Sequence, residues 1–457
     1  MRQTLVLDVV GLTPALLPHA PRLSALARRG AVRPLRTITP AVTCSVQSTF
    51  LTGLPPSRHG VVANGWYFRD LAQVSFWQQS NHLVDGEKLW ETARLRDPAF
   101  TCAQMFWWYN MYSSADFTVT PRPQYPADGR KLPDVYSEPA ELGRELQERL
   151  GTFPLFQFWG PRADLASSDW IAKASEHVFS TRRPTLTLVY LPHLDYDLQR
   201  FGPNHPRASA AAAAVDATCA PLLDAAEKAG AAVIVLSEYG VTEVTGAIHV
   251  NRALREAGLL RVRGERMGEQ LDAGASEAFA VADHQIAHVY VKRPERIPEV
   301  AALLRGLEGI ESVWSGPDRR DHGLDHSRAG EIVAISRADR WFTYYHWLRD
   351  DDAPDYARTV DIHRKPGYDP VELFVDPTIA LPRLKVAWTL AKRKLGFRSL
   401  LDVIGLDAAL VRGSHGRPTD QADAGPLFIT SEPQHLPPGD DLAATDVKGT
   451  ILNHLFP

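Results

Sequence analysis

Short apolar runs alternate with helical stretches along the chain. Thr4 to Val10 is an apolar run that stops at Gly11, which is typical of a buried parallel strand. From Pro21 to Arg29, apolar side chains recur at helical spacing, and the pattern ends at Gly30. The chain is therefore predicted to open with a strand followed by a helix.

The same alternation returns further along the chain. Apolar runs predict strands at 185–191, 232–236, 286–291 and 331–336, and helical patterns cover 208–229 and 298–307. Strands that alternate with helices predict an α/β fold with a doubly wound, mostly parallel central sheet flanked by helices. In such sheets, binding sites lie at the carboxyl ends of the strands.

Two regions interrupt this pattern, and we expect them as insertions in a single domain over residues 1–457. Residues from about 66 to 180 are dense in aromatic residues and prolines, which predicts a cap over a pocket. The region from about 245 to 410 predicts further insertions, including a basic amphipathic helix between Pro382 and Asp402. Such a stretch is most commonly a surface helix with extended lysines, and its functional alternative is contact with a membrane or an anionic ligand.

Composition narrows the functional classes. Charged residues make up 23% of the 457 residues and the net charge is -4, so nothing favours a nucleic-acid partner. The three cysteines fit neither a zinc ribbon nor a disulfide framework, which suits a reducing compartment. No secretory signal and no integral membrane segment is evident. We therefore expect a cytoplasmic protein, with its oligomeric state left open.

The segment TPAVTCSVQSTFLTGLPPSRHGVVANGW (39–66) carries the strongest motif. Thr43 is expected to open a helix that ends at Thr52-Gly53, and Asn64 follows in the next loop. A threonine hydroxyl at such a helix start lies where backbone N–H groups point toward an anion. Threonine is also common there as an ordinary helix cap.

This segment resembles the nucleophile region of the type I phosphodiesterase/nucleotide pyrophosphatase family, a branch of the alkaline phosphatase superfamily. The resemblance implies an alkaline-phosphatase-like fold and hydrolysis of a small phosphorylated substrate through a phospho-enzyme intermediate. It places Thr43 at the nucleophile. Asn64 falls on a later motif position, where it could donate to a phosphoryl oxygen as charge develops.

The resemblance also implies divalent metal ions, usually two zinc ions. Later segments match the ligand positions of the family at Asp195 and His415, whereas Val10, Gln199, Glu238 and Tyr239 depart from them. Glu238 can still coordinate a metal. Asp8 lies two residues before Val10 on the same strand face and could replace the missing carboxylate.

Further side chains could complete the metal site. Asp361 and His363 share one face in VDIHRKPGYD (360–369), and ADHQIAH (282–288) offers Asp283 and His284. The candidate metal ligands are Asp8, Thr43, Asp195, Glu238, His363 and His415. Because oxygen replaces imidazole at several positions, manganese or magnesium becomes an alternative to the family's zinc.

Three functions remain open on these motifs. The first is a working phosphodiesterase with a rebuilt metal site. The second is a phosphomonoesterase or phosphonate hydrolase on the same fold, and the third is a catalytically degenerate protein that binds a phosphorylated ligand or a partner. The aromatic residues Trp107, Trp108, Tyr109 and Trp159 fit either a ring-bearing substrate or a domain interface.

Overall fold

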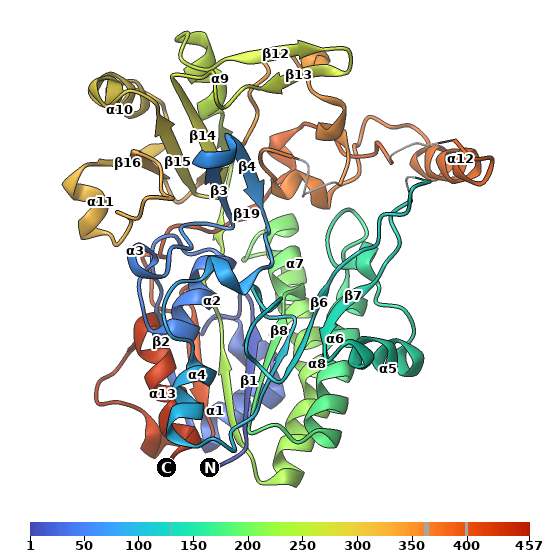
Figure 1. Ribbon diagram of the computed structural model, residues 1–457, viewed down its shortest axis with the longest axis vertical. Coiled ribbons are helices and arrows are strands. Elements are labelled where there is room, and N and C mark those ends of the chain that lie inside the picture. Colours follow the sequence, from blue (N-terminus) through green and yellow to red (C-terminus); the bar gives the residue numbers. More distant parts are fainter. Residues whose placement is uncertain (129, 361–364, 398–400) are drawn as a thin grey trace.

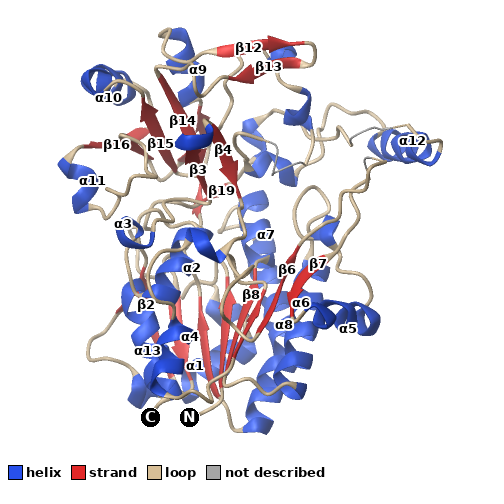
Figure 2. Ribbon diagram, viewed as in Figure 1, coloured by secondary structure: helices blue, strands red, loops and turns tan. Residues whose placement is uncertain are grey.

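A nine-stranded sheet forms the lower half of the protein in the computed structural model, which describes residues 1–128, 130–360, 365–397 and 401–457 (Figures 1 and 2). The strand order is β21-β2-β20-β9-β1-β8-β5-β6-β7. In that order the strands are Leu442–Ala443, Ala31–Arg36, Leu427–Thr430, Ala232–Leu236, Thr4–Val9, Leu186–Leu191, Cys102–Met105, Phe117–Pro121 and Val135–Glu138.

The centre of this sheet is parallel and fully buried. β1 pairs in parallel with β8 on one side and β9 on the other, and Asp8 lies opposite Tyr190 and Leu236. β20 and β7 run antiparallel to their neighbours. The α/β fold with a mostly parallel central sheet is thus confirmed. The near-continuous apolar sequences of β1, β8 and β9 reflect burial on both faces.

Helices cover both faces of the sheet. One apolar cluster joins odd-numbered β1 residues such as Leu5 and Leu7 to helices α1, α5, α6 and α8, and another joins Val6 to α2, α4 and α13. These helices are Pro21–Arg29 (α1), Thr43–Thr52 (α2), Leu89–Arg96 (α4), Ala140–Leu150 (α5), Leu165–Thr181 (α6), Pro206–Ala229 (α8) and Val447–Leu455 (α13). The predicted helix at 21–29 is confirmed, and the one at 208–229 begins two residues earlier, at Pro206.

A second layer of structure lies above the carboxyl edge of the sheet (Figure 1). It is built on a four-stranded antiparallel sheet in the order β14-β15-β17-β16. The strands are Ala278–Asp283 (β14), Ile286–Val291 (β15), Ile332–Ser336 (β17) and Ile310–Ser315 (β16). Around them lie α9 (Val250–Glu256), α10 (Ile297–Arg305) and α11 (Pro317–Asp321). We call this part the upper lobe.

Short pairs of strands complete the described part of the fold. They are β3 with β4 (Gly65–Phe68, Gln73–Phe76), β10 with β19 (Thr242–Glu243, Gly413–Ser414), β11 with β18 (Gly246–Ile248, Arg340–Phe342) and β12 with β13 (Val262–Glu265, Gly268–Leu271). Two more helices are α3 (Pro56–His59) and α7 (His193–Phe201). Figure 1 places β12 and β13 at the far end of the upper lobe, away from the central sheet.

The two regions that interrupt the strand–helix pattern differ in form. Residues 66–180 include β5, β6 and β7, so this segment extends the central sheet as well as supplying aromatic side chains above it. The region 245–410 builds most of the upper lobe and ends in α12 (Pro382–Lys394), which projects from the body (Figure 1). Across the described ranges, no helix combines the length and apolarity that a membrane crossing requires.

Candidate active site

A small cavity of about 60 Å³ opens at the carboxyl edge of the central sheet, below the upper lobe. Its polar lining comes from the nucleophile segment, from the ends of β8 and β9 and from the loop after β19. Aromatic side chains close the rest. The lining residues are Thr43, Asn64, Trp77, Trp108, Phe158, Trp159, Tyr190, Asp195, Tyr196, Tyr239, Tyr368 and His415.

Thr43 is the first residue of α2, after Val42 in an extended conformation. Its side chain is buried, and its Oγ1 lies 3.1 Å from the hydroxyl of Tyr239. Gly53 ends the same helix in the left-handed region, with φ 70°, so the predicted boundaries of this helix are correct. The Thr43 hydroxyl therefore faces the cavity at the positive end of a helix dipole.

Asn64 is held from two directions. Its Oδ1 accepts a hydrogen bond from the Cys44 backbone N–H at 2.9 Å, directly after the nucleophile position. Its Nδ2 donates to Asp283 Oδ1 at 3.2 Å, and its backbone N–H donates to Asp283 Oδ2 at 2.7 Å. Burial raises the pKa of Asp283 to about 7, against the lowering effect of these bonds. Asp283 thus fixes the orientation of the Asn64 amide beside Thr43.

Asp283 reaches this position because it ends strand β14, at the tip of a tight hairpin. Asp283 pairs with Ile286, so only His284 and Gln285 lie in the turn, and His284 adopts φ 59°. Such a conformation is uncommon for a residue with a side chain. The hairpin inserts the edge of the upper lobe into the site.

A glutamine amide joins two buried carboxylates beneath Thr43. Gln47 lies one helical turn after Thr43 and donates through Nε2 to Asp8 Oδ2 at 3.1 Å and to Glu238 Oε1 at 2.8 Å. The Trp108 backbone N–H donates to Gln47 Oε1 at 2.8 Å, which fixes the orientation of the amide. Burial raises the pKa of Glu238 to about 7, and burial together with Glu238 raises the pKa of Asp8 well above its usual range.

A second carboxylate–glutamine pair lies on α7. Asp195, in the first turn, accepts a hydrogen bond at 2.6 Å from Gln199 Nε2, one turn later on the same helix. Burial raises the pKa of Asp195 to about 8. Gln199 occupies a position where the family resemblance implies histidine, so its amide bonds the carboxylate where an imidazole would bind metal.

His415 stacks between two other rings. Its ring centroid lies 3.7 Å from that of Tyr239 and 3.8 Å from that of His284. Its Nδ1 donates to the Ala41 carbonyl at 2.9 Å, because a carbonyl can only accept. Burial lowers the pKa of His415 to about 3, so the ring is neutral and Nε2 is an acceptor. His284 is in turn hydrogen-bonded through Nε2 to the Tyr368 hydroxyl.

The structure brings most of the predicted site residues together. Thr43, Asn64, Asp195 and His415 line the cavity, and Asp8 and Glu238 meet beneath it through Gln47. Predicted ligand His363, with its neighbour Asp361, lies outside the described residues. Asp283, predicted as a further metal candidate, instead binds Asn64.

These residues do not fit a two-zinc cage. Within the described part of the chain, no three histidine, cysteine, aspartate or glutamate side chains gather closely enough to hold a metal ion. Two glutamine amides bond the carboxylates, and the remaining imidazole, His415, is stacked between rings. One oxygen of each carboxylate, in Asp8, Asp195 and Glu238, has no hydrogen-bond partner in the described ranges.

Sequence reasoning did not identify Gln47, Trp77 or Tyr368 as site residues. Gln47 had a usable signal, because a residue four positions after Thr43 projects from the same helix face. Trp77 and Tyr368 come from separate segments, and their rings meet at 5.1 Å. No local pattern places those two side chains together.

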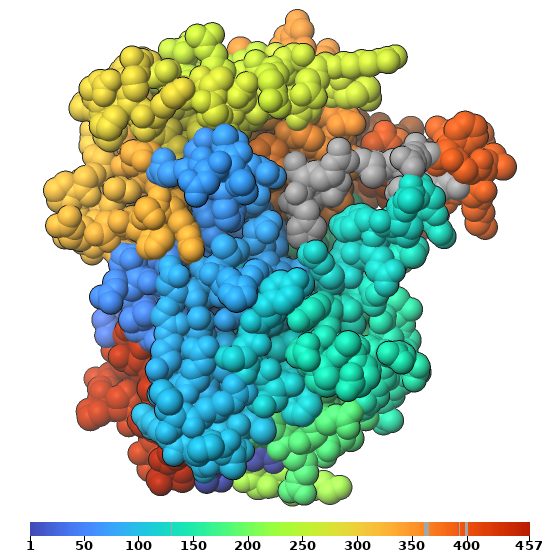
Figure 3. Space-filling model, viewed as in Figure 1, coloured from blue at the N-terminus to red at the C-terminus, as the bar shows by residue number. Residues whose placement is uncertain are grey.

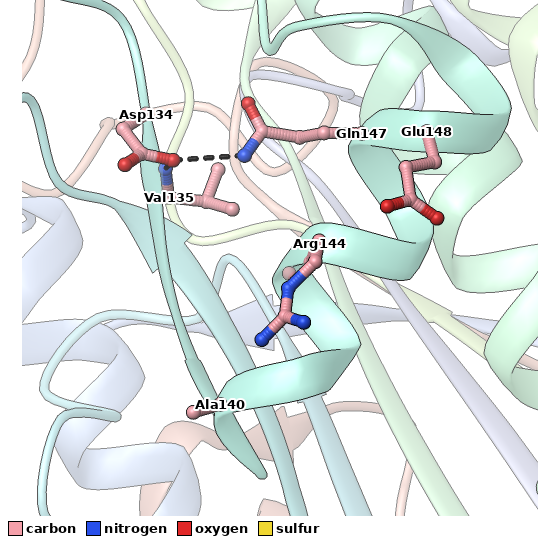
Figure 4. Close-up of a pocket in the computed structure, with 7 residues that line it drawn as sticks. Asp134, Val135, Ala140, Arg144, Gln147 and Glu148 are labelled. Carbon is pink, nitrogen blue, oxygen red and sulfur yellow. Dashed lines mark hydrogen bonds between the residues drawn. The ribbon is translucent and has the colours of Figure 1, made fainter.

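A second pocket, of about 450 Å³, lies apart from this site at the edge of the sheet. Figure 4 shows Gln147 projecting from α5 toward Asp134, with Arg144 and Glu148 on the same helix. Gln147 Nε2 donates to Asp134 Oδ1 at 2.8 Å. The seven residues that line this pocket include no hydroxyl, thiol or imidazole.

Several solved structures share this fold. The phosphonoacetate hydrolase of Sinorhizobium meliloti 1021, in complex with phosphonoformate, has a TM-score of 0.62 at 16% identity, covering 99% of this chain and 96% of that one. Murine ectonucleotide pyrophosphatase/phosphodiesterase 5, as an inactive threonine-to-alanine variant in complex with AMP, has a TM-score of 0.59 at 15% identity, covering 100% and 95%. The human protein gives 0.58 at 13% identity, with the same coverage.

No curated protein sequence matches this chain significantly. A family model does match, over residues 4–369, which is most of the chain and includes β1, the Thr43 segment, α7 and Glu238. The chain belongs to the type I phosphodiesterase/nucleotide pyrophosphatase family.

Proposed function

We propose that this protein hydrolyses phosphate esters and that Thr43 is its nucleophile. The observation that carries the proposal is the place of the Thr43 hydroxyl. It starts helix α2, opens to the cavity at the carboxyl edge of the sheet and lies beside the Asn64 amide. A positioned hydroxyl with hydrogen-bond donors for the developing charge is what phosphoryl transfer requires.

The side chains present suggest a sequence of steps. Thr43 Oγ1 attacks phosphorus, so an Oγ1–P bond forms and the bond from phosphorus to the leaving oxygen breaks. The hydroxyl proton passes to Glu238, a buried carboxylate whose pKa burial raises to about 7, which suits a general base. Asn64 Nδ2 donates to a phosphoryl oxygen, held in place by Asp283. The oxygen of a water molecule then attacks phosphorus, so a new O–P bond forms, the Oγ1–P bond breaks and one proton of that water passes to Thr43 Oγ1.

Members of this family typically bind metal ions, which supply Lewis-acid stabilisation of phosphoryl oxygens. Because the glutamine amides here bond the carboxylates, no step above depends on a metal. Zinc remains the ion that the family implies, with manganese or magnesium as alternatives at oxygen ligands. The assay is therefore run with each ion and with chelator.

A phosphodiester with an aromatic group is the substrate class that we propose. Trp77, Trp108 and Trp159 line the cavity with Tyr368, and an apolar wall of this kind fits a ring beside the phosphorus. The AMP complex of the murine relative supports this choice. The phosphonoacetate hydrolase favours cleavage of a carbon–phosphorus bond as a second candidate on the same fold.

The test is hydrolysis of bis-p-nitrophenyl phosphate by the purified full chain. We expect turnover in the wild type and loss of turnover in Thr43→Ala, while phosphonoacetate is not cleaved. Full activity of Thr43→Ala would contradict the nucleophile assignment. No turnover of any phosphate ester, with every ion and with chelator, would contradict the proposal and favour a protein that only binds a phosphorylated ligand.

A further inference from the structure

The segment around α12 carries an unusual concentration of exposed apolar side chains. Within the helix, Leu384 is 63% exposed and Trp388 is 61% exposed. Exposed Leu381 precedes the helix, and exposed Leu395 and Phe397 follow it. Solvated surfaces of monomeric proteins rarely gather large apolar side chains in this way, and such patches commonly mark interaction sites.

These apolar positions form one stripe. Leu384 and Trp388 are four residues apart, so they lie on the same helix face. Leu381 is three residues before Leu384, just ahead of the helix. The opposite face holds the helix to the body. Val386 packs against an apolar cluster that includes Trp341 and Val371, and the Thr389 side chain is buried.

Basic residues border the stripe. The segment from 382 to 397 contains lysine and arginine but neither aspartate nor glutamate. Arg383 and Lys394 are exposed, and the Lys392 ammonium lies 5.6 Å from the Trp388 ring centroid. Lys385 forms an ion pair with Asp402 at 2.9 Å. The surface thus combines an apolar stripe with a positive border.

We propose that α12 docks on an anionic phospholipid surface, with its apolar stripe at the boundary between headgroups and acyl chains. A basic helix with tryptophan and leucine on one face has the composition of an interfacial helix. The helix projects at the periphery of the molecule, where a flat surface can reach it (Figures 1 and 3). A symmetric pairing of two copies through α12 would instead bring like charges together.

The first experiment measures sedimentation of the full chain with vesicles. The vesicles contain phosphatidylcholine alone or phosphatidylcholine with added phosphatidylglycerol. We expect binding to the anionic vesicles, weakened by salt. Leu384→Glu combined with Trp388→Ser should weaken this binding at least tenfold. Leu95→Glu, at a leucine on α4 that is 78% exposed, is the matched control and should bind as the wild type does.

A second pair of variants separates charge from apolar contact. Arg383→Gln combined with Lys394→Gln should weaken binding to anionic vesicles roughly 25-fold, because each basic residue near such a surface contributes about fivefold. Arg28→Gln combined with Arg149→Gln removes two exposed charges elsewhere and should leave binding unchanged. Phosphodiester hydrolysis in solution should be unaffected in all these variants.

Three results would overturn the proposal. The first is that the wild type binds neither kind of vesicle, and the second is that the α12 variants bind as tightly as the wild type. The third is a dimer in sedimentation equilibrium without lipid that Leu384→Glu dissociates, which would make this surface a contact between copies.

Discussion

The candidate active site has two halves, and buried polar groups are hydrogen-bonded in a different way in each half. On the Thr43 side, the Cys44 backbone N–H, Asn64 and Asp283 form a chain of hydrogen bonds anchored to the start of α2, directly after Thr43. On the carboxylate side, Asp8 and Glu238 are bonded by the Gln47 amide. In the first half, Thr43 and Asn64 lie at the positions that the family resemblance implies. The second half holds amide groups at carboxylates that resemble metal ligands.

The difference shows which parts of such a site can change independently. A helix start, a hydroxyl and an amide donor can act together when local geometry places them correctly, and they need no partner for a charge. Two buried carboxylates need a partner for their charge, and an amide donates hydrogen bonds without a full positive charge. Burial raises the pKa values of Asp8, Glu238 and Asp195, and the hydrogen bonds from the glutamine amides offset only part of that rise.

The largest expected effect is at the nucleophile. Thr43→Ala should lower kcat for bis-p-nitrophenyl phosphate at least about 1,000-fold, because no covalent intermediate can form. Thr43→Ser keeps the hydroxyl and should retain measurable turnover. If Thr43→Ser were as inactive as Thr43→Ala, the loss would reflect packing of the buried threonine instead of its chemistry.

A smaller loss is expected at Asn64. Asn64→Ala should lower kcat roughly 100-fold with little change in KM, since a donor to the developing charge acts mainly in the transition state. Asn64→Asp keeps an acceptor for the Cys44 N–H but loses the donor, so it should be at least as damaging. Turnover near the wild-type rate in Asn64→Asp would rule out the donor role.

On the carboxylate side, the readout is stability. Gln47→Ala should lower the free energy of unfolding in urea by about 2 kcal/mol, because two buried carboxylates lose their shared donor. Manganese should then stabilise the variant more than it stabilises the wild type. The matched control is Gln79→Ala, which removes a buried amide bonded to the Pro121 carbonyl, away from these carboxylates.

Equal stabilisation of Gln47→Ala and the wild type by manganese would contradict the proposed difference between the two halves of the site. It would mean that the amide does not stand in for a cation at Asp8 and Glu238. Manganese stabilisation of Gln79→Ala by the same extra amount would show that the response is unrelated to this site.

The smallest effect is a pH dependence at Asp283. Its folded pKa, about 7, lies above the unfolded value of about 3.9, so its protonation stabilises the fold. That contribution is fully present below about pH 4 and is lost as the pH rises through 7. Compared with Asp283→Asn, the wild type should lose roughly 2 kcal/mol of unfolding free energy between about pH 5 and pH 7. A difference that is constant with pH would contradict the assignment.

The central sheet could be predicted because strands that are buried on both faces are apolar along their whole length. β1, β8 and β9 read as continuous apolar runs, and parallel strands place their carboxyl ends at one edge. That rule, with the family motifs, brought Thr43, Asp195, Glu238 and His415 to one place. The antiparallel direction of β20 and β7 left no comparable local pattern.

The features of the site that could not be predicted from the sequence depend on contacts between distant segments. Asp283 reaches Asn64 across 219 positions through the β14–β15 hairpin, and the Asp8–Gln47–Glu238 bridge joins three separate elements. The apolar run at 286–291 predicts strand β15. It does not indicate which part of the molecule the turn of the β14–β15 hairpin will contact. Hydrogen bonds between buried polar groups are set by the packing around them.

The most direct test of the account is to trap the covalent intermediate on Thr43. The full chain is mixed with bis-p-nitrophenyl phosphate, quenched in acid and digested, and the peptide containing Thr43 is analysed by mass spectrometry. We predict a p-nitrophenyl phosphoryl group on Thr43 that accompanies release of the first p-nitrophenolate and is missing in Thr43→Ala. Turnover with an unmodified Thr43 peptide, or modification of another residue, would contradict the central claim.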